Sequence, residues 1–164
     1  MAVRSIMVLP APVLRTTSRE VEPQAPETAH LIEDMLDTLY STKGVGLAAV
    51  QLGVPKRVVV VDLGRETSRQ PQIFINPIIV ETSTEETSLR EGCLSIPDTM
   101  VDVVRPERVT VCYFGLDGQQ RVVEAAGILA KCLQHEVDHL NGVLITDYGS
   151  PISAELSEAA NQRD

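Results

Sequence analysis

The sequence contains no apolar run that approaches the ~20 residues a membrane-spanning helix needs. Positive charge is also scarce, because 14 lysines and arginines stand against 23 aspartates and glutamates, for a formal net charge of −9. This balance argues against binding nucleic acid or anionic lipid through a broad basic face. Residues 1–9 are too short for a signal peptide, and no small-residue cleavage site follows them. We therefore expect a cytoplasmic protein with no membrane or nucleic-acid partner.

Cysteine is scarce as well. The three cysteines, Cys93, Cys112 and Cys132, are odd in number and scattered, so they do not form a disulfide framework. In a reducing compartment each is a core filler, a ligand or a nucleophile. No internal repeat divides the chain, and its 164 residues are enough for one domain that buries about 70% of its unfolded surface. We expect a single domain over residues 1–164, with a short polar tail from about residue 151.

The first strong periodic pattern predicts a helix over residues 27–43, after a polar loop at 16–26. Apolar residues recur there with the i, i+3, i+4, i+7, i+8 spacing of an amphipathic helix. They are Ile32, Met35, Leu36, Leu39 and Tyr40. Gly44 follows, where a left-handed cap is expected to end the helix. His30 lies off the apolar stripe, so we assign it to solvent.

The middle of the chain favours strands. Valine and isoleucine, which are enriched in strands, dominate residues 57–63, 73–80, 108–114 and 120–125. Leu116, Asp117 and Gly118 predict a turn between the last two strands. The polar segment 81–90 is interpreted as a surface connection.

A second helix is predicted over residues 126–140. Its apolar residues occupy more than one face, which is typical of a helix buried on most sides. They are Ile128, Leu129, Cys132, Leu133, Val137 and Leu140. The sequence therefore predicts an α+β fold in which mainly antiparallel strands wrap around a central buried helix.

This buried helix carries the pentapeptide His-Glu-Val-Asp-His at residues 135–139. On a helix, residues four apart share a face, so His135 and His139 can both bind one cation. Glu136 follows the first ligand and can take a proton from a metal-bound water. Two histidines at this spacing can also lie on a solvated helix face. The rest of the chain favours the metal site.

A catalytic zinc-type site needs a third protein ligand. In the common proteases with this motif that ligand lies downstream, where this chain offers Glu155 and Glu158 in a polar tail. Cys93 is the better candidate, because a thiolate in the segment 91–95, Glu-Gly-Cys-Leu-Ser, would complete a set of one cysteine and two histidines. The small-residue segment 44–51, which ends at Gln51, lets backbone approach a ligand closely.

Together these segments resemble the peptide deformylases, which remove the formyl group from the N-terminus of newly made bacterial and organellar proteins. The three motifs of that family are a GφGLAAxQ loop, an EGCLS segment and a QHExDH helix. They match residues 44–51, 91–95 and 134–139 in the same order. The likeness continues at residues 10–15, 75–77 and 140–144. It covers roughly residues 3–151.

The resemblance implies a role for each matching residue. The metal ligands would be Cys93, His135 and His139, and Glu136 would be the general acid/base. The Gln51 side chain and the Leu94 backbone N–H would stabilise the charge that develops on the formyl oxygen. The substrate would be bound by the backbones of Val45, Gly46 and Gly92, with its methionine side chain in a pocket formed by Val45, Leu89, Ile128 and Cys132.

The resemblance also implies cofactor and partners. One divalent ion is expected per chain, Fe²⁺ in the cell, with Zn²⁺, Ni²⁺ or Co²⁺ as substitutes. The substrates would be formyl-methionyl nascent peptides. Ribosome contact is possible, but a long basic C-terminal helix, which some relatives use for it, is missing. Carboxylates that hydrogen-bond to histidine ligands usually orient them, and Glu91 and Asp138 are the local candidates. Lys131 is interpreted as a lysine that extends to solvent at the pocket rim.

Two other functions remain open on the residues alone. One is a zinc endoprotease whose third ligand is Glu155 or Glu158. The other is a non-catalytic paralogue that keeps the fold and binds peptide N-termini. Because every catalytic position is intact, the sequence favours the deformylase over both.

Overall fold

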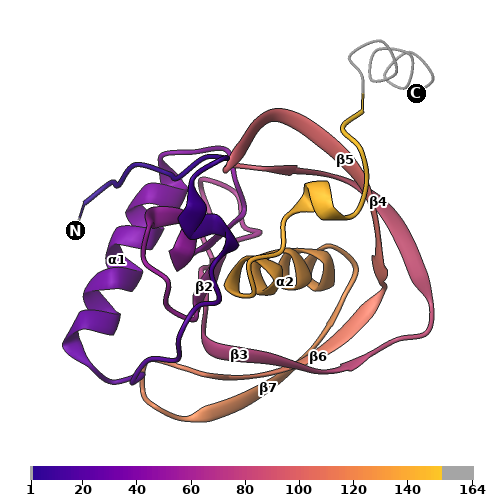
Figure 1. Cartoon of the computed structure of the whole chain (residues 1–164). Helices are drawn as coiled ribbons and strands as arrows, with labels where there is room; N and C mark the ends of the chain where they lie inside the picture. Colours follow the sequence, from indigo (N-terminus) through magenta and orange to yellow (C-terminus); the bar gives the residue numbers. More distant parts are fainter. Residues whose placement is uncertain (1, 153–164) are drawn as a thin grey trace.

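The computed structural model describes residues 2–152 of the chain (Figure 1). Its two α-helices are α1 (Pro26–Tyr40) and α2 (Gly127–Leu140). The strands are β1 (Gly46–Ala48), β2 (Val58–Val61), β3 (Gln72–Thr82), β4 (Glu86–Cys93), β5 (Ile96–Pro106), β6 (Arg108–Phe114) and β7 (Gln120–Ala126). Short 3-10 helices η1 (Pro12–Arg15), η2 (Ala49–Leu52) and η3 (Ile145–Asp147) connect them.

The strands form two antiparallel sheets. The larger has the order β1-β2-β3-β6-β7, so β1 is one of its edge strands, and the smaller is the hairpin β4-β5. Every pairing between named strands is antiparallel. This confirms the predicted combination of helices with antiparallel strands.

The four consecutive valines of β2 show why the larger sheet is covered on both faces. Side chains alternate across a strand, so Val58 and Val60 point one way and Val59 and Val61 the other. The first pair packs in a cluster with α1 residues such as Met35, and the second packs in a cluster with Leu133 of α2. All four valines are fully buried. An unbroken apolar run is what a strand needs when both of its faces are covered.

Helix α2 packs against strands of both sheets, including β1, β2 and β7 on one side and β5 on the other. In Figure 1 it lies between the larger sheet and the β4-β5 hairpin. Leu133 and Leu140 are fully buried, and Val137 nearly so. The helix is thereby fixed against two surfaces, which sets the positions of the side chains it carries.

Helix α1 ends earlier than predicted. It stops at Tyr40 rather than at residue 43, and Gly44 does not adopt the left-handed conformation of a cap. The hydroxyls of Ser41 and Thr42 donate to the carbonyls of Thr38 and Leu39 instead. These bonds satisfy the last carbonyls of the helix, so no glycine cap is required.

The predicted surface connection at 81–90 is wrong. Residues 72–82 belong to β3, and Glu86–Cys93 forms β4 of the hairpin. Most side chains of β4 are exposed, so the strand lacks the alternation that would predict it. The consequence for the site is large, because β4 carries Leu89, Gly92 and Cys93.

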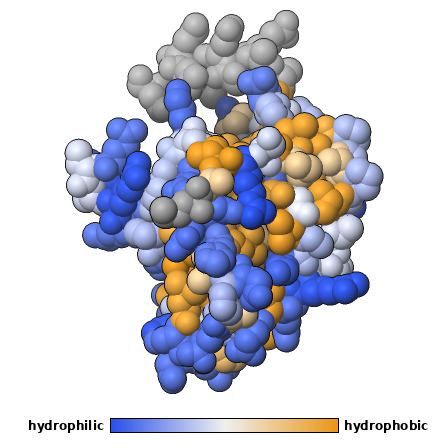
Figure 2. All heavy atoms as spheres, turned by 90° about the vertical axis from the view of Figure 1, so that its left-hand side faces the viewer, coloured by the Kyte–Doolittle hydropathy of each residue, from blue (hydrophilic) through white to orange (hydrophobic). Residues whose placement is uncertain are grey.

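Figure 2 views the molecule from the side of α1. Hydrophilic side chains cover most of this face, and apolar side chains gather in separate patches rather than one continuous surface. Neither α-helix of the described residues has the length and apolar character that crossing a membrane requires.

Candidate active site and metal centre

A cavity of about 800 Å³ opens where β1, the β4-β5 hairpin and α2 meet. Every predicted site residue except His139 lines it. Among the predicted ligands and catalytic residues these are Gln51, Cys93, Leu94, His135 and Glu136. Among the predicted substrate contacts they are Val45, Gly46, Leu89, Gly92, Ile128 and Cys132. His139 is only 1% exposed and lies behind the cavity wall.

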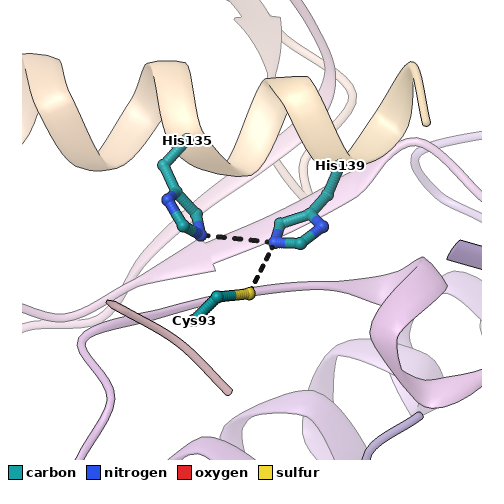
Figure 3. A group of neighbouring side chains, drawn as sticks. All are labelled: Cys93, His135 and His139. Carbon is teal, nitrogen blue, oxygen red and sulfur yellow. Dashed lines mark hydrogen bonds between the residues drawn. The ribbon is translucent and has the colours of Figure 1, made fainter. Parts of the chain in front are cut away.

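The three predicted metal ligands lie together (Figure 3), and two of them, Cys93 and His135, line this cavity. The two histidines come from successive turns of α2, and the cysteine comes from the end of β4. Nε2 of His139 is 3.3 Å from Nε2 of His135 and 3.3 Å from Sγ of Cys93. All three donor atoms lie within 4.8 Å of one another. No other group of His, Cys, Asp and Glu among residues 2–152 has this arrangement.

This donor set fits a divalent transition-metal ion. Two imidazoles and one thiolate are three protein ligands, the number that a catalytic zinc-type site uses. Burial lowers the pKa of His139 to about 3, so its ring is neutral, the form that binds a metal. Burial also opposes the charge on His135, but the hydrogen bonds to Cys93 and Glu91 outweigh it and raise its pKa to about 10. An ion would displace that proton.

A buried charge network holds His135 in place. Nδ1 of His135 lies 2.8 Å from Oε1 of Glu91. Arg105, only 3% exposed, binds Glu91 through two nitrogens at 2.6 and 3.0 Å, and it also binds Asp138 at 2.8 Å. Burial alone would raise the pKa of Glu91, but His135 and Arg105 hold it below its usual value. Glu91 is therefore ionised and can orient the ring so that Nε2 faces the other donors.

Tyr148 extends this network beyond the helix. Its hydroxyl donates to Oδ2 of Asp138 at 2.6 Å, and its ring lies under the Arg105 guanidinium, 4.7 Å from the guanidinium carbon to the ring centroid. Glu91 and Asp138, both predicted to orient ligands, thus share one arginine. Only Glu91 contacts a predicted ligand directly.

Glu136 is buried beside the donor cluster without a hydrogen bond. Only 5% of the residue is exposed, and its Oε2 has no partner among the described residues. Burial raises the pKa of its carboxyl group to about 7. A side chain on Gly46 would collide with this carboxylate, because a Cβ there would lie 2.8 Å from Oε1 of Glu136. Glycine at 46 therefore leaves room for the Glu136 carboxylate, which lines the cavity.

Gln51 is held by three fixed partners. Its Oε1 accepts from the Ala48 N–H at 3.0 Å, and its Nε2 donates to Oγ of Ser95 at 3.0 Å. Nε2 also lies 3.8 Å from Sγ of Cys93. The amide nitrogen is thus aimed at the donor cluster and cannot flip without losing two good hydrogen bonds. Ser95, fully buried, was not predicted as part of this site.

Two further residues that line the cavity are Cys132 and Lys131 of α2. Burial raises the pKa of Cys132 to about 12, so this residue is a neutral thiol. Lys131 was expected to extend to solvent, and this was wrong. It is 4% exposed, and Nζ donates to the carbonyls of Thr87 and Arg105 at 2.9 and 2.8 Å. The hairpin β4-β5 covers the position that sequence alone placed at the rim.

Arg105 is the main residue that sequence reasoning missed. A signal was present, because Val101 and Val103 alternate inward along β5 and Arg105 is the next inward position. A charged residue at an inward position indicates a buried partner, since an unpaired buried charge costs several kcal/mol or more.

The predicted alternative ligands fall outside the described residues. Glu155 and Glu158 both lie beyond residue 152. Cys112 lies on β6 and is not part of the donor cluster. Cys132 lines the cavity but is not part of the donor cluster either.

Comparison with known proteins agrees with this geometry. The family model described as Polypeptide deformylase matches residues 3–155. A peptide deformylase of Agrobacterium fabrum is 48% identical over 157 residues, which are 95% of this chain and 92% of that protein. One of Rhizobium meliloti is also 48% identical, over 95% of this chain and 90% of that protein.

Solved structures give the same result. Peptide deformylase from Ehrlichia chaffeensis in complex with actinonin matches with a TM-score of 0.84 and 40% identity, over 99% of this chain and 96% of that one. The Met-Ala-Ser-bound class I type b enzyme from Acinetobacter baumannii matches with a TM-score of 0.84 and 32% identity, over 90% of this chain and 98% of that one. The chain therefore belongs to the polypeptide deformylase family, whose members are enzymes that remove the formyl group from nascent peptides.

Proposed function

We propose that this enzyme hydrolyses the N-formyl group from formyl-methionine at the start of newly synthesised polypeptides, releasing formate and a free amine. One observation carries the proposal: a Cys93, His135 and His139 donor cluster at the inner end of a cavity whose wall is mostly apolar. A related structure holds Met-Ala-Ser, which is the product expected from a formylated Met-Ala-Ser peptide. Because nascent chains emerge from ribosomes, we place the activity in the cytoplasm, close to the ribosome.

The metal would be held by Sγ of Cys93 and Nε2 of His135 and His139. A divalent ion there supplies Lewis acidity, which lowers the pKa of a coordinated water toward ~7 and polarises a carbonyl group. Deformylases depend on a metal, and we propose Fe²⁺ as the resident ion of this chain. Zn²⁺, Ni²⁺ and Co²⁺ suit the same donors, because such sites select poorly among first-row ions.

Glu136 would move the proton. It lies next to the donor cluster with an unpartnered carboxylate oxygen, so it can accept a proton from the attacking water. The same carboxyl group would then protonate the departing amine. Gln51 would donate a hydrogen bond to the formyl oxygen, together with the Leu94 backbone N–H. These donors stabilise the transition state most if they are fixed before the reaction, and Ser95 and Ala48 fix Gln51.

The peptide would bind as an added strand. Gly46 lies on β1, an edge strand that pairs with β2, and Gly92 lies near the end of β4. The backbones of Val45, Gly46 and Gly92 would pair with the extended peptide. Its methionine side chain would occupy the part of the cavity that is lined by Val45, Leu89, Ile128 and Cys132.

The direct test is formate release. Metal-loaded protein incubated with formyl-Met-Ala-Ser is expected to produce one formate for each free Met-Ala-Ser, measured by a coupled formate assay and by mass spectrometry. An endoprotease would instead cut an internal peptide bond, and a non-catalytic paralogue would bind the peptide without product. Either result would replace the deformylase proposal.

The choice of metal is a second expected result. Zinc prefers four ligands, whereas ferrous iron readily accepts five. We therefore expect the Fe²⁺ and Ni²⁺ forms to turn over formyl-Met-Ala-Ser much faster than the Zn²⁺ form, when all are prepared anaerobically from one apoprotein. Air should inactivate the iron form, since oxygen oxidises both Fe²⁺ and the Cys93 thiolate. Metal analysis must show equal loading. Equal rates, or an iron form stable in air, would contradict this account.

A further inference from the structure

Lys131 is a buried cation that the proposed chemistry does not use. It is 4% exposed and lines the cavity. Its ammonium group donates to two neutral acceptors, the carbonyl of Thr87 on β4 and the carbonyl of Arg105 on β5. No carboxylate of residues 2–152 forms an ion pair with it.

One N–H of the Lys131 ammonium group has no acceptor among the described residues. A lysine carries three N–H donors, and the backbone carbonyls accept two of them. Within the described part of the chain no third acceptor contacts Nζ. A buried donor without a partner is unfavourable, so the remaining N–H gains from any acceptor that enters the cavity.

Lys131 lies on the face of α2 that lines the cavity. Ile128, Lys131 and His135 lie on the cavity face of α2, and Lys131 is one helical turn, about 6 Å, before His135. The formyl group must react at the donor cluster, where His135 lies. An unbranched side chain that follows the same helix face away from the cluster therefore passes Lys131 at its outer half.

On the basis of the proposed deformylase function, we propose that Lys131 makes this pocket selective by hydrogen bonding and charge, and not by shape alone. The pocket would accept N-formyl residues whose side chain carries an oxygen acceptor near the place of the methionine sulfur. Methionine sulfoxide is the natural example, since oxidation converts the apolar thioether into a strong acceptor. Cationic side chains of similar length would be rejected by the ammonium charge.

A purely structural role is the competing explanation. The two hydrogen bonds of Lys131 tie α2 to both strands of the hairpin, so its loss can loosen the cavity as a whole. The two roles differ in one measurable respect. A structural tie affects all substrates alike, whereas a hydrogen bond to the side chain affects only the substrate that carries an acceptor.

The experiment compares three peptides that differ only in the first side chain: formyl-Met-Ala-Ser, its sulfoxide, and formyl-norleucine-Ala-Ser. For the unmodified enzyme, kcat/KM for the sulfoxide should lie within about tenfold of the norleucine value, because the lost apolar contact is offset by the new hydrogen bond. In Lys131→Met the ratio of sulfoxide to norleucine should fall by about 10- to 100-fold, the range for one hydrogen bond to a charged donor. Lys56→Met, which removes a lysine outside the cavity, should leave the ratio unchanged.

An unchanged ratio in Lys131→Met, or an equal loss for all three peptides, would overturn the inference. If that variant fails to fold, the unmodified enzyme still tests the inference. A kcat/KM for the sulfoxide peptide more than about 1000-fold below that for the norleucine peptide would mean that no hydrogen-bond donor faces the pocket. Absence of turnover with the methionine and norleucine peptides would instead overturn the proposed function, on which the inference rests.

Discussion

Replacing Glu136 with alanine is expected to lower kcat/KM for formyl-Met-Ala-Ser by about 10²–10⁴-fold while metal content stays at one ion per chain. The reason is geometric. Glu136 follows His135 on α2, lies beside the donor cluster, and has a buried oxygen with no partner among the described residues. It can therefore exchange protons with a reacting water without being needed as a ligand. Rates come from formate release, and metal content comes from elemental analysis of the purified variant.

Two further variants sharpen this test. Glu136→Gln keeps the shape of the side chain but removes the basic oxygen, so it should lose as much activity as the alanine variant. Glu33→Ala removes an exposed glutamate from α1, far from the cavity, and should match the unmodified enzyme. Full activity in Glu136→Gln would remove Glu136 from proton transfer. Loss of metal in both variants would mean that it holds the ion or its ligands instead.

Local periodicity accounts for the parts of the fold that the sequence predicts well. Strand β6 has the predicted bounds, Arg108–Phe114, and β7 and α2 differ from prediction by one residue at one end. Each of these elements has strong alternation, a turn or helical spacing within its own residues. The proposed pair of histidine ligands can be predicted from this local pattern alone, because i and i+4 share a helix face in any helix.

Strand β4 could not be predicted from the pattern of its own residues. Five of its eight residues are exposed, and the strand exists because β5 pairs with it over its whole length. This pairing joins residues up to 20 positions apart, such as Glu86 and Pro106, and no sequence pattern within β4 predicts it. The position of Lys131 depends on the same pairing, since its two acceptors are carbonyls of the hairpin.

The candidate site also contains residues that the sequence predicted and residues that it did not. Its proposed ligands and its proposed acid/base are predicted from residue type and motif resemblance, and the structure brings Cys93 from β4 next to two histidines from α2. The supporting residues Ser95, Arg105 and Tyr148 were not foreseen. Each contributes through a contact with a residue distant in sequence, such as Arg105 with Asp138. Inward alternation along β5 is the one signal that points to Arg105.

Cys93→Ala is expected to abolish stable metal binding and, with it, formate release. Sγ of Cys93 lies 3.3 Å from Nε2 of His139, and it is the one thiol of the described residues in the donor cluster. Its removal leaves two imidazoles four residues apart, whereas catalytic sites of this kind use three protein ligands.

Metal content after gel filtration, measured by elemental analysis, is the primary readout, with far-UV circular dichroism to verify that the fold persists. Cys112→Ala is the matched control, because it removes a thiol on β6 and should keep one ion per chain. Glu155→Ala tests the endoprotease alternative and should also keep the ion. Metal near one ion per chain in Cys93→Ala would exclude Cys93 as a ligand, and loss of metal in Glu155→Ala would transfer that role to the carboxylate. The three variants therefore decide between Cys93 and Glu155 as the third ligand by metal content alone, independently of any rate.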